Sequence, residues 1–279
     1  MSFQIGISQI LFNLRSVNRD FDTVTTQLST GKKINGSKDD PAVWSRITRS
    51  RSEFGQYSAI NDSLNSVATS VNIADGSMDA IGKTIEEMKG TLESIFANTP
   101  PLPVGSEERT KLIQAYGEMR TQIDQLSAPT DEGAKKIMAD PAIGGIDDWT
   151  ILVGPNGMIR TIRKEEVHTG PTGLNIPELT DTSTDAEIQD ALTRLEAAAT
   201  TLGARKRSLE MDSVAIAKAQ DYNTQLGNAH LTYAENAGAA DMNEAAARAQ
   251  SLQLRQDLSS QSLKMLSNAD ARMLQLLLG

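Results

Sequence analysis

The sequence contains no cysteine and only two histidines, His168 and His230, among its 279 residues. Without cysteine there are no disulfides, thiolate nucleophiles, iron–sulfur clusters or cysteine-ligated zinc sites. Two histidines leave too little imidazole for a histidine-rich metal site or a Ser-His-Asp triad, and neither histidine has HExxH spacing. We therefore expect a protein that is not an enzyme, with no catalytic residues, no cofactor and no metal.

Positive charge and long apolar runs are also scarce. The formal net charge is −9, which argues against nucleic acid as a partner because phosphate contacts need an excess of Lys and Arg. No apolar run approaches the ~18–20 residues that span a bilayer, so we expect no membrane insertion. The first residues lack a basic segment followed by a continuous apolar one, so no cleavable signal peptide is expected. Aromatic residues make up 4% of the chain, which favours a core built as thin seams of aliphatic side chains.

A regular 3–4 alternation of apolar residues begins at the start of the chain. No polar residue interrupts this alternation, and most residues between its members are polar. This spacing predicts an amphipathic helix with one narrow apolar stripe, as coiled-coil partners need. The stripe consists of Phe3, Ile7, Ile10, Leu14, Val17, Phe21, Val24 and Leu28.

Three further helices are expected between the two ends of the chain. The alternation from Tyr57 to Ile95 predicts a helix too long for an ordinary globular domain, which favours a rod-like bundle. A run from Leu112 to Leu126 predicts a shorter helix, with Ser106 as its N-terminal cap. The pattern returns from Ile188 to Ile216, and Thr184 or Asp185 is expected to cap that helix.

The last apolar run spans residues 249–277, and three of its nine positions are polar, namely Gln256, Ser259 and Asp270. The chain ends on a conspicuously apolar segment, and an exposed patch of this kind usually marks an interaction surface. The pattern alone is equally that of the core of a monomeric helix bundle. The placement of amphipathic segments at both ends favours pairing with each other or with neighbouring chains; the C-terminal members of this assembly seam are Leu263, Leu266, Met273 and Leu277.

Residues 129–185 break the helical pattern. Strand-like residues flank Gly154-Pro-Asn-Gly157, and Asn-Gly between such segments is a strong hairpin signal. An isolated hairpin is barely stable in water, so we expect this one to dock on the helices.

The segment QLSTGKKINGSKDDPA at residues 27–42 resembles the N-terminal motif of bacterial flagellins. The segment from residue 240 to the C-terminus also resembles the closing region of this family, with Ala269-Asp270 where Ala-Asn is common. The resemblance covers about residues 1–128 and 186–279, and the central segment is where flagellins vary.

The resemblance implies a mainly α fold, an elongated helical bundle and coiled coil built from both chain termini with a small β-hairpin insertion. Residues 1–43 with 240–279 would form the filament core, residues 44–128 with 186–239 a helical rod, and residues 129–185 a short surface insertion. The chain would polymerise with copies of itself in an extracellular flagellar filament. It would be exported unfolded, meeting the export machinery, a secretion chaperone and the filament cap and junction proteins.

The loop between the first two helices has its own chemistry. Pro41 suits the first turn of a helix, and Asp39 or Asp40 is expected to cap it. One interpretation is a simple interhelical connector. With the resemblance we favour a subunit contact, formed by Lys32, Lys33, Asn35, Asp39, Asp40 and Pro41.

The resemblance also aligns Ile85–Thr91 with a basic stretch through which an innate immune receptor senses many flagellins. Glu87 then stands where the receptor-contacting residue is usually Arg. The hypothesis is that the receptor recognises this chain poorly, because an acidic side chain replaces a cation.

Two alternatives to a filament subunit stay open. A hook–filament junction protein shares the terminal helices and the Asp-Asp-Pro loop, but is present at about one ring rather than thousands of copies. A soluble coiled-coil adaptor that binds a partner helix would have ordered termini without polymerisation. The pairs Asp39-Asp40 and Asp147-Asp148 resemble acid–base or metal pairs, but caps and turns explain such pairs more simply.

Overall fold

The computed structural model describes residues 2–97, 100–138 and 148–278, with side chains from residue 8 to residue 272 except Asp270 and the gaps. The chain forms two compact units, which we treat separately. The terminal unit comprises residues 1–54 and 228–279, and the central unit comprises residues 55–227. Over the described residues there are six helices and one two-stranded sheet, which confirms the predicted mainly α fold.

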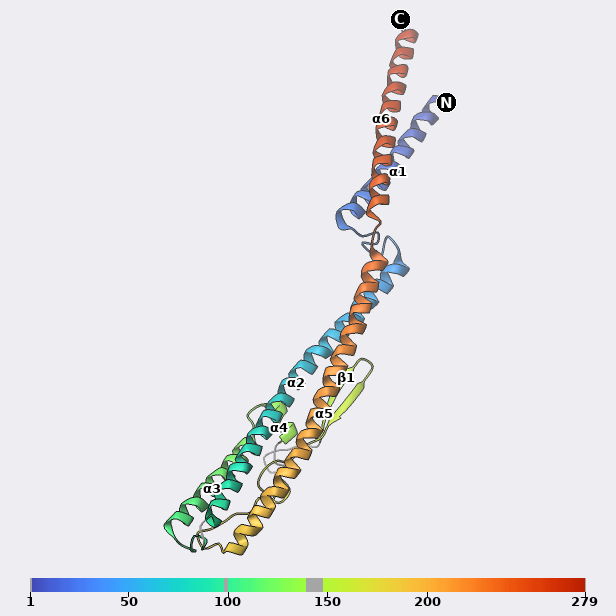
Figure 1. The fold of residues 1–279 in the computed structure, drawn as a ribbon. Helices are drawn as coiled ribbons and strands as arrows, with labels where there is room; N and C mark the ends of the chain where they lie inside the picture. Colours follow the sequence, from blue (N-terminus) through green and yellow to red (C-terminus); the bar gives the residue numbers. More distant parts are fainter. Residues whose placement is uncertain (1, 98–99, 139–147, 279) are drawn as a thin grey trace. The chain divides into compact units, whose positions relative to one another are not determined.

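In the terminal unit, helices α1 (Ser2–Thr30) and α6 (Met242–Leu278) lie side by side (Figure 1). A second part of this unit joins the start of α2 (Pro41–Phe96) to the end of α5 (Asp185–Gly238). Ile34, Ile47 and Ala234 form its small buried core. A Cβ at Gly238 would lie 3.2 Å from Cδ1 of Ile47, so a small residue suits this close approach.

Backbone hydrogen bonds connect the two parts of the chain in the terminal unit. The amide of Lys33 donates to the carbonyl oxygen of Gly238 at 2.8 Å, and the amide of Ala240 donates to that of Gly31 at 3.0 Å. Gly31 has a φ of 66°, which favours glycine at the end of α1. The loop after α1 is thus bonded to the connection between α5 and α6.

In the central unit, the remaining lengths of α2 and α5 run beside each other, and α3 (Glu107–Leu126) packs on their shared core (Figure 1). The apolar stripe predicted for residues 57–95 is buried from Ile60 onward. Its buried members are Ile60, Leu64, Val67, Val71, Ala74, Met78, Ile81, Ile85, Met88, Leu92 and Ile95. Burying the stripe offsets the helix-weakening effect of Gly76, Gly82 and Gly90, which lie in α2 outside the stripe.

Two predicted helix caps have different outcomes. Thr184 and Glu187 form a reciprocal capping box at the start of α5: the Thr184 amide donates to the Glu187 carboxylate at 2.6 Å, and the Glu187 amide donates to the Thr184 hydroxyl at 3.3 Å. The Thr184 amide and the Thr184 hydroxyl both donate to the Glu187 carboxylate, and these two bonds lower the pKa of that carboxyl. Ser106 occupies the N-cap position of α3, but its side chain makes no capping hydrogen bond. The predicted position of the cap is therefore confirmed, but the hydrogen bond that a capping side chain usually makes is absent.

A buried arginine connects the starts of α3 and α5. Arg109 is 1% exposed, and its guanidinium donates to the carbonyl oxygens of Leu102 and Ser183 and to the carboxylate of Asp185. Nearby, the buried hydroxyl of Tyr116 donates to the carbonyl oxygen of Pro177 at 2.7 Å, and burial raises the pKa of that hydroxyl.

The expected loss of helix across residues 129–185 was wrong at one place, where the chain forms α4 (Glu132–Met138). Asp131 caps this helix by accepting from the Ala134 amide at 2.7 Å, and Ile137 and Met138 are buried. Seven residues are too few to show a helical repeat in the sequence.

The predicted hairpin is confirmed. Strands β1 (Trp149–Gly154) and β2 (Met158–Ile162) pair antiparallel, and Asn156 and Gly157 have positive φ values of 60° and 77° in the turn. Ile151 and Ile162 are buried in the helical core, so the hairpin docks as expected.

Candidate assembly interface

The predicted N-terminal stripe meets helix α6 over part of its length. Val24 is buried together with Ala245 and Leu252, and the half-buried side chains of Val17, Phe21, Leu28 and Ala249 pack around them. Thus four of the predicted seam residues (Val17, Phe21, Val24, Leu28) lie in one α1–α6 contact. The 3–4 spacing brings them to one side of α1 because positions three and four apart lie on the same helix face.

The other seam residues are not enclosed. Ile10, Leu14, Leu263 and Leu266 are only half-buried. The side chains of Ile7, Met273 and Leu277 lie outside those that the structure describes. Their role in assembly stays a prediction.

A polar pair lies next to this apolar contact. The amide of Gln256 on α6 donates to the side-chain oxygen of Asn18 on α1 at 2.8 Å. Gln256 is one of the three polar positions of the C-terminal run, and this hydrogen bond gives its polar side chain a partner on α1. Sequence reasoning did not find Asn18, because it lies one residue outside the stripe.

Helix α6 carries a second apolar stripe that the sequence analysis missed. Leu254, Leu258 and Met265 are 61%, 54% and 71% exposed. Their spacings of four and seven residues place them on one face of the helix, apart from the residues that contact α1. The sequence contained this stripe as apolar residues that do not fall on the 3–4 positions of the main seam. Such a face on an exposed helix marks an interaction surface.

The loop predicted as a subunit contact is held in a defined shape by its two aspartates. The carboxylate of Asp39 accepts from the amides of Asn35 and Gly36 at 2.7 and 3.0 Å. The carboxylate of Asp40 accepts from the amides of Ala42 and Val43 at 2.9 and 3.0 Å. Asp40 is therefore the cap of α2, and Asp39 braces the preceding turn. Both aspartates serve backbone geometry.

The remaining loop residues face outward. Lys32, Lys33 and Asn35 are exposed, as is Pro41 at the first position of α2. The side-chain amide of Asn35 donates to the carbonyl oxygen of Lys32 at 3.0 Å, which closes the turn from the other side. The loop thus presents two ammonium groups on a hydrogen-bonded frame.

Glu87 lies on the outer face of α2 in the central unit, and its side chain is exposed. Its buried neighbours Ile85 and Met88 belong to the helical core. An exposed carboxylate on a rigid helix is available to a large partner.

The polar residues first considered for catalysis have structural partners. Asp148 accepts from the Lys164 amide at 3.1 Å, and the ring of His168 accepts from the Gly170 amide at 3.0 Å. His230 lies 2.9 Å from a carboxylate oxygen of Glu53. Asp147 lies outside the described residues. Within the described part of the chain, no three His, Asp or Glu side chains gather as metal ligands.

None of the helices, over their described residues, has the length and apolarity needed to cross a membrane.

Comparison with known proteins identifies the family. The model of the bacterial flagellin N-terminal helical region matches residues 2–140. Flagellin FljM of Caulobacter vibrioides is 25% identical, covering 95% of this chain and 94% of the relative. Flagellin C of Rhizobium meliloti is 23% identical, covering 95% of each chain. A crystal structure of Bacillus cereus flagellin gives a TM-score of 0.48 at 12% identity, covering 58% of this chain and 88% of that one.

The family model covers helices α1 to α4 together with the Asp-Asp-Pro loop between α1 and α2, and the relatives extend the match over α5 and α6 to almost the whole chain. By these matches and its paired terminal helices, this chain belongs to the bacterial flagellins, the structural subunits of the flagellar filament.

Proposed function

We propose that this chain polymerises through its terminal helices into a filament that drives swimming, after export in an unfolded state through the flagellar secretion system. The observation that carries this proposal is the second apolar stripe of α6, Leu254, Leu258 and Met265, which is exposed while α1 covers another face of the helix. Apolar area removed from water contributes roughly 25 cal/mol per Å². Neighbouring copies that cover this stripe would gain that free energy.

Contacts between unlike surfaces of identical chains repeat without closing, and so generate filaments. A helix whose two apolar faces meet different neighbours suits this kind of assembly. In this proposal the assembly seam also includes the half-buried positions Ile10, Leu14, Leu263 and Leu266, together with Ile7, Met273 and Leu277.

We assign roles to the segments on the same basis. Residues 1–43 with 240–279 form the filament core, and residues 44–128 with 186–239 form the surrounding rod. Residues 129–185 form the short outer surface. The loop residues Lys32, Lys33, Asn35, Asp39, Asp40 and Pro41 form a subunit contact, supported by the exposed ammonium groups on a braced turn.

The proposed partners follow from the same function. They are further copies of this chain, the export machinery, a secretion chaperone and the cap and junction proteins, with the assembled filament outside the cell. The chain performs no catalysis in this role.

Seeded growth tests the proposal. Purified protein is added to short filament fragments, and elongation is followed by electron microscopy for the full chain and for a form without residues 1–40 and 241–279. Long filaments from the full chain and none from the truncated form are expected. A short ring or an ordered monomer under every condition would contradict the proposal in favour of a junction protein or an adaptor.

A point variant tests the carrying observation itself. Leu258→Asp should prevent elongation while leaving the thermal unfolding of the monomer unchanged, since Leu258 is 54% exposed. Gln253→Asp, at an exposed polar position of the same helix, is the matched control. If Leu258→Asp elongates at the rate of the control, the stripe is not a contact between neighbouring copies.

We also propose that innate immune recognition is weak because Glu87 presents an exposed carboxylate where a cation is usual. A receptor-reporter assay with purified monomer should show little activation by the natural chain and more by Glu87→Arg. Strong activation by the natural chain would defeat this proposal.

A further inference from the structure

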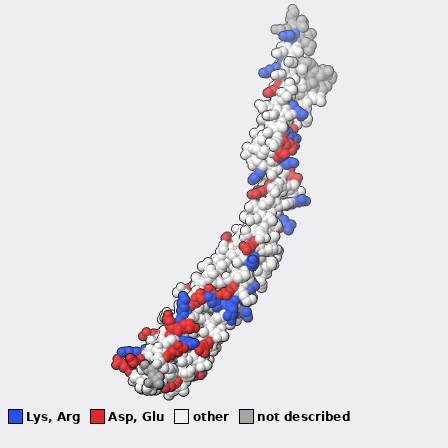
Figure 2. Space-filling view, in the orientation of Figure 1, with Lys and Arg blue, Asp and Glu red and all other residues white. Residues whose placement is uncertain are grey.

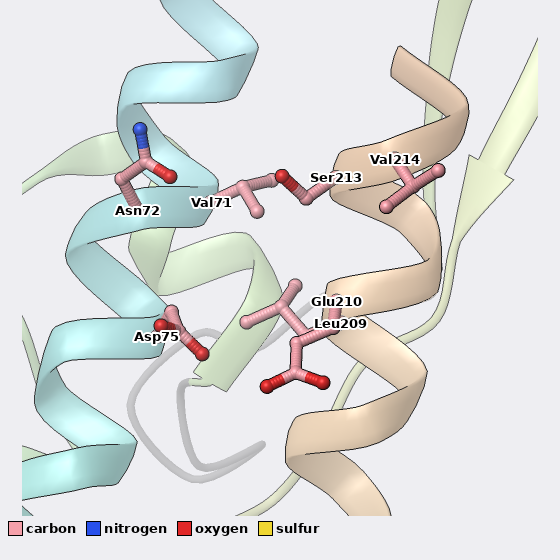
Figure 3. Close-up of a pocket in the computed structure, with 7 residues that line it drawn as sticks. All are labelled: Val71, Asn72, Asp75, Leu209, Glu210, Ser213 and Val214. Atoms are coloured by element: carbon pink, nitrogen blue, oxygen red, sulfur yellow. The ribbon is translucent and has the colours of Figure 1, made fainter. Parts of the chain in front are cut away.

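A groove lies between α2 and α5 in the central unit (Figure 3). It has a volume of about 340 Å³ and is lined by Val71, Asn72, Asp75, Leu209, Glu210, Ser213 and Val214. Val71 and Leu209 belong to the buried core and form its apolar floor. Asp75 and Glu210 extend into it from opposite helices (Figure 3). An apolar floor between two carboxylates suits a side chain with an apolar stem and a cationic head.

The carboxylate of Asp75 has spare capacity to accept hydrogen bonds. Its Oδ1 is buried and accepts none. The ammonium group of Lys206 lies 3.8 Å away, but it donates its hydrogen bond to Asp79. A buried carboxylate oxygen without a hydrogen bond costs free energy, which a new donor would recover.

Glu210, on the facing helix, is exposed and forms no salt bridge among the described residues, although its charge helps to raise the pKa of the nearby Lys206 ammonium. Beside it, Val214 is 60% exposed at the edge of the groove. A guanidinium is the cation that best meets two carboxylates, because its planar fork donates in several directions and is weakly hydrated.

The chain itself supplies such a cation. The terminal unit has 12 Lys and Arg against 10 Asp and Glu, a net charge of +2, whereas the central unit has 15 against 26, a net charge of −11. Figure 2 shows groups of Asp and Glu over the central unit, with Lys and Arg side chains among them. Two copies therefore attract when the terminal unit of one approaches the central unit of another.

Within the terminal unit, two exposed arginines stand out. Arg46 and Arg49 on α2 border an open groove with Tyr233. Arg49 already pairs with Glu53 at 3.1 Å, whereas Arg46 takes part in no ion pair among the described residues. Arg46 is thus the arginine of this groove whose charge is uncompensated.

We propose that Arg46 of one copy enters the α2–α5 groove of a second copy and pairs there with Asp75 and Glu210. This inference rests on the proposed polymerisation and names one contact within it. The two surfaces are unlike, so the contact repeats from copy to copy without closing. It also sets the direction of approach, because the acceptor lies in the acidic central unit and the donor in the terminal unit.

Charge reversal in seeded elongation tests the contact. Arg46→Glu and Glu210→Arg should each slow elongation about ten-fold or more at low salt, as expected for a close, partly desolvated pair. The double variant should recover most of the natural rate. Arg51→Glu and Asp62→Lys are the matched controls, since both reverse an exposed charge on another face of α2. Monomer unfolding curves confirm that each variant is folded, and Glu210→Gln takes the place of Glu210→Arg if that variant is not folded.

Cross-linking gives an independent measurement, because the natural chain has no cysteine. Arg46→Cys protein and Asn72→Cys protein are mixed, polymerised and treated with a short bismaleimide about as long as an arginine side chain. Covalent dimers are expected from this pair and not when Arg51→Cys replaces Arg46→Cys.

The outcomes separate this contact from the proposed function. If the natural chain never elongates, the polymerisation proposal fails and this contact fails with it. If the natural chain elongates, but the reversed variants elongate equally well and no cross-link forms, only the Arg46 contact is overturned. A cross-link without rescue by the double variant would also overturn it, since proximity would then occur without pairing.

Discussion

Gln256 of α6 donates a hydrogen bond to Asn18 of α1 at 2.8 Å, beside the apolar contact formed by Val24 and Leu252. A polar pair next to a coiled-coil seam lowers stability but specifies register, because any sliding of one helix leaves both amides without partners. One of the three polar interruptions of the C-terminal run, Gln256, is therefore matched by a polar partner on α1.

Replacing both members of this pair should stabilise the pair of terminal helices but make their register less specific. Asn18→Leu with Gln256→Leu is expected to stabilise the terminal helices by about 1 kcal/mol, since both polar groups are removed together. Filaments of this variant should show a broader spread of helical parameters by cryo-electron microscopy. Gln253→Leu, at an exposed position, is the control. Unchanged helical uniformity in the double variant would contradict the register role.

Arg109 should be among the most sensitive residues of the central unit. It is 1% exposed, whereas the side chain of its ion-pair partner Asp185 is 54% exposed. Arg109→Ala leaves two backbone carbonyls without their charged donor, so we expect a loss of about 3–5 kcal/mol in the free energy of unfolding. Urea unfolding measures this loss. Arg194→Ala, which breaks an exposed pair with Asp190, should cost under about 1 kcal/mol. Equal losses would contradict the role of burial.

The capping box of α5 predicts a pH-dependent contribution to stability. The Thr184 amide lowers the pKa of Glu187 in the folded chain, so the unfolded chain binds the proton more readily. The contribution is therefore present above the ordinary glutamate range and is lost as the pH falls. The difference in urea midpoint between the natural chain and Glu187→Gln should be largest near neutral pH and should shrink in acid. Thr184→Ser, which keeps the hydroxyl, should retain the pH dependence.

The docking of the hairpin depends on Asn223 of α5. This residue is fully buried, and its side-chain amide donates to the carbonyl oxygen of Val153 at 2.9 Å and to the side chain of Asn61 at 3.2 Å. Asn223→Ala should cost about 1–3 kcal/mol because it leaves the Val153 carbonyl without a donor. Hydrogen exchange should become faster in β1 and stay unchanged in α3. Asn65→Ala, at an exposed position, should change stability by no more than about 0.5 kcal/mol.

Apolar spacing alone determined most of the helices. The long stripe of α2 is predictable because a helix repeats every 3.6 residues, so Leu64, Val71 and Met78 must share a face whatever lies opposite. The hairpin was equally local, since Asn156-Gly157 favours its turn. The Thr184 cap was also correct, because a capping box is formed by residues three apart. Helix α4 was missed because seven residues are too short for a period.

Only the tertiary structure decided which polar groups have partners and which apolar faces lack them. Ser106 occupies the N-cap position but its side chain makes no capping hydrogen bond, whereas Asp39 stabilises a turn and Asp40 caps a helix. The Asn18–Gln256 pair joins residues that are distant in the chain, and so does the groove at Asp75. The exposed stripe of α6 is exposed only because α1 covers a different face of the helix. The local sequence determines where helices form and which residues share a helix face. Which side chains become partners depends on how the helices pack against one another, and the sequence of a single helix does not specify that packing.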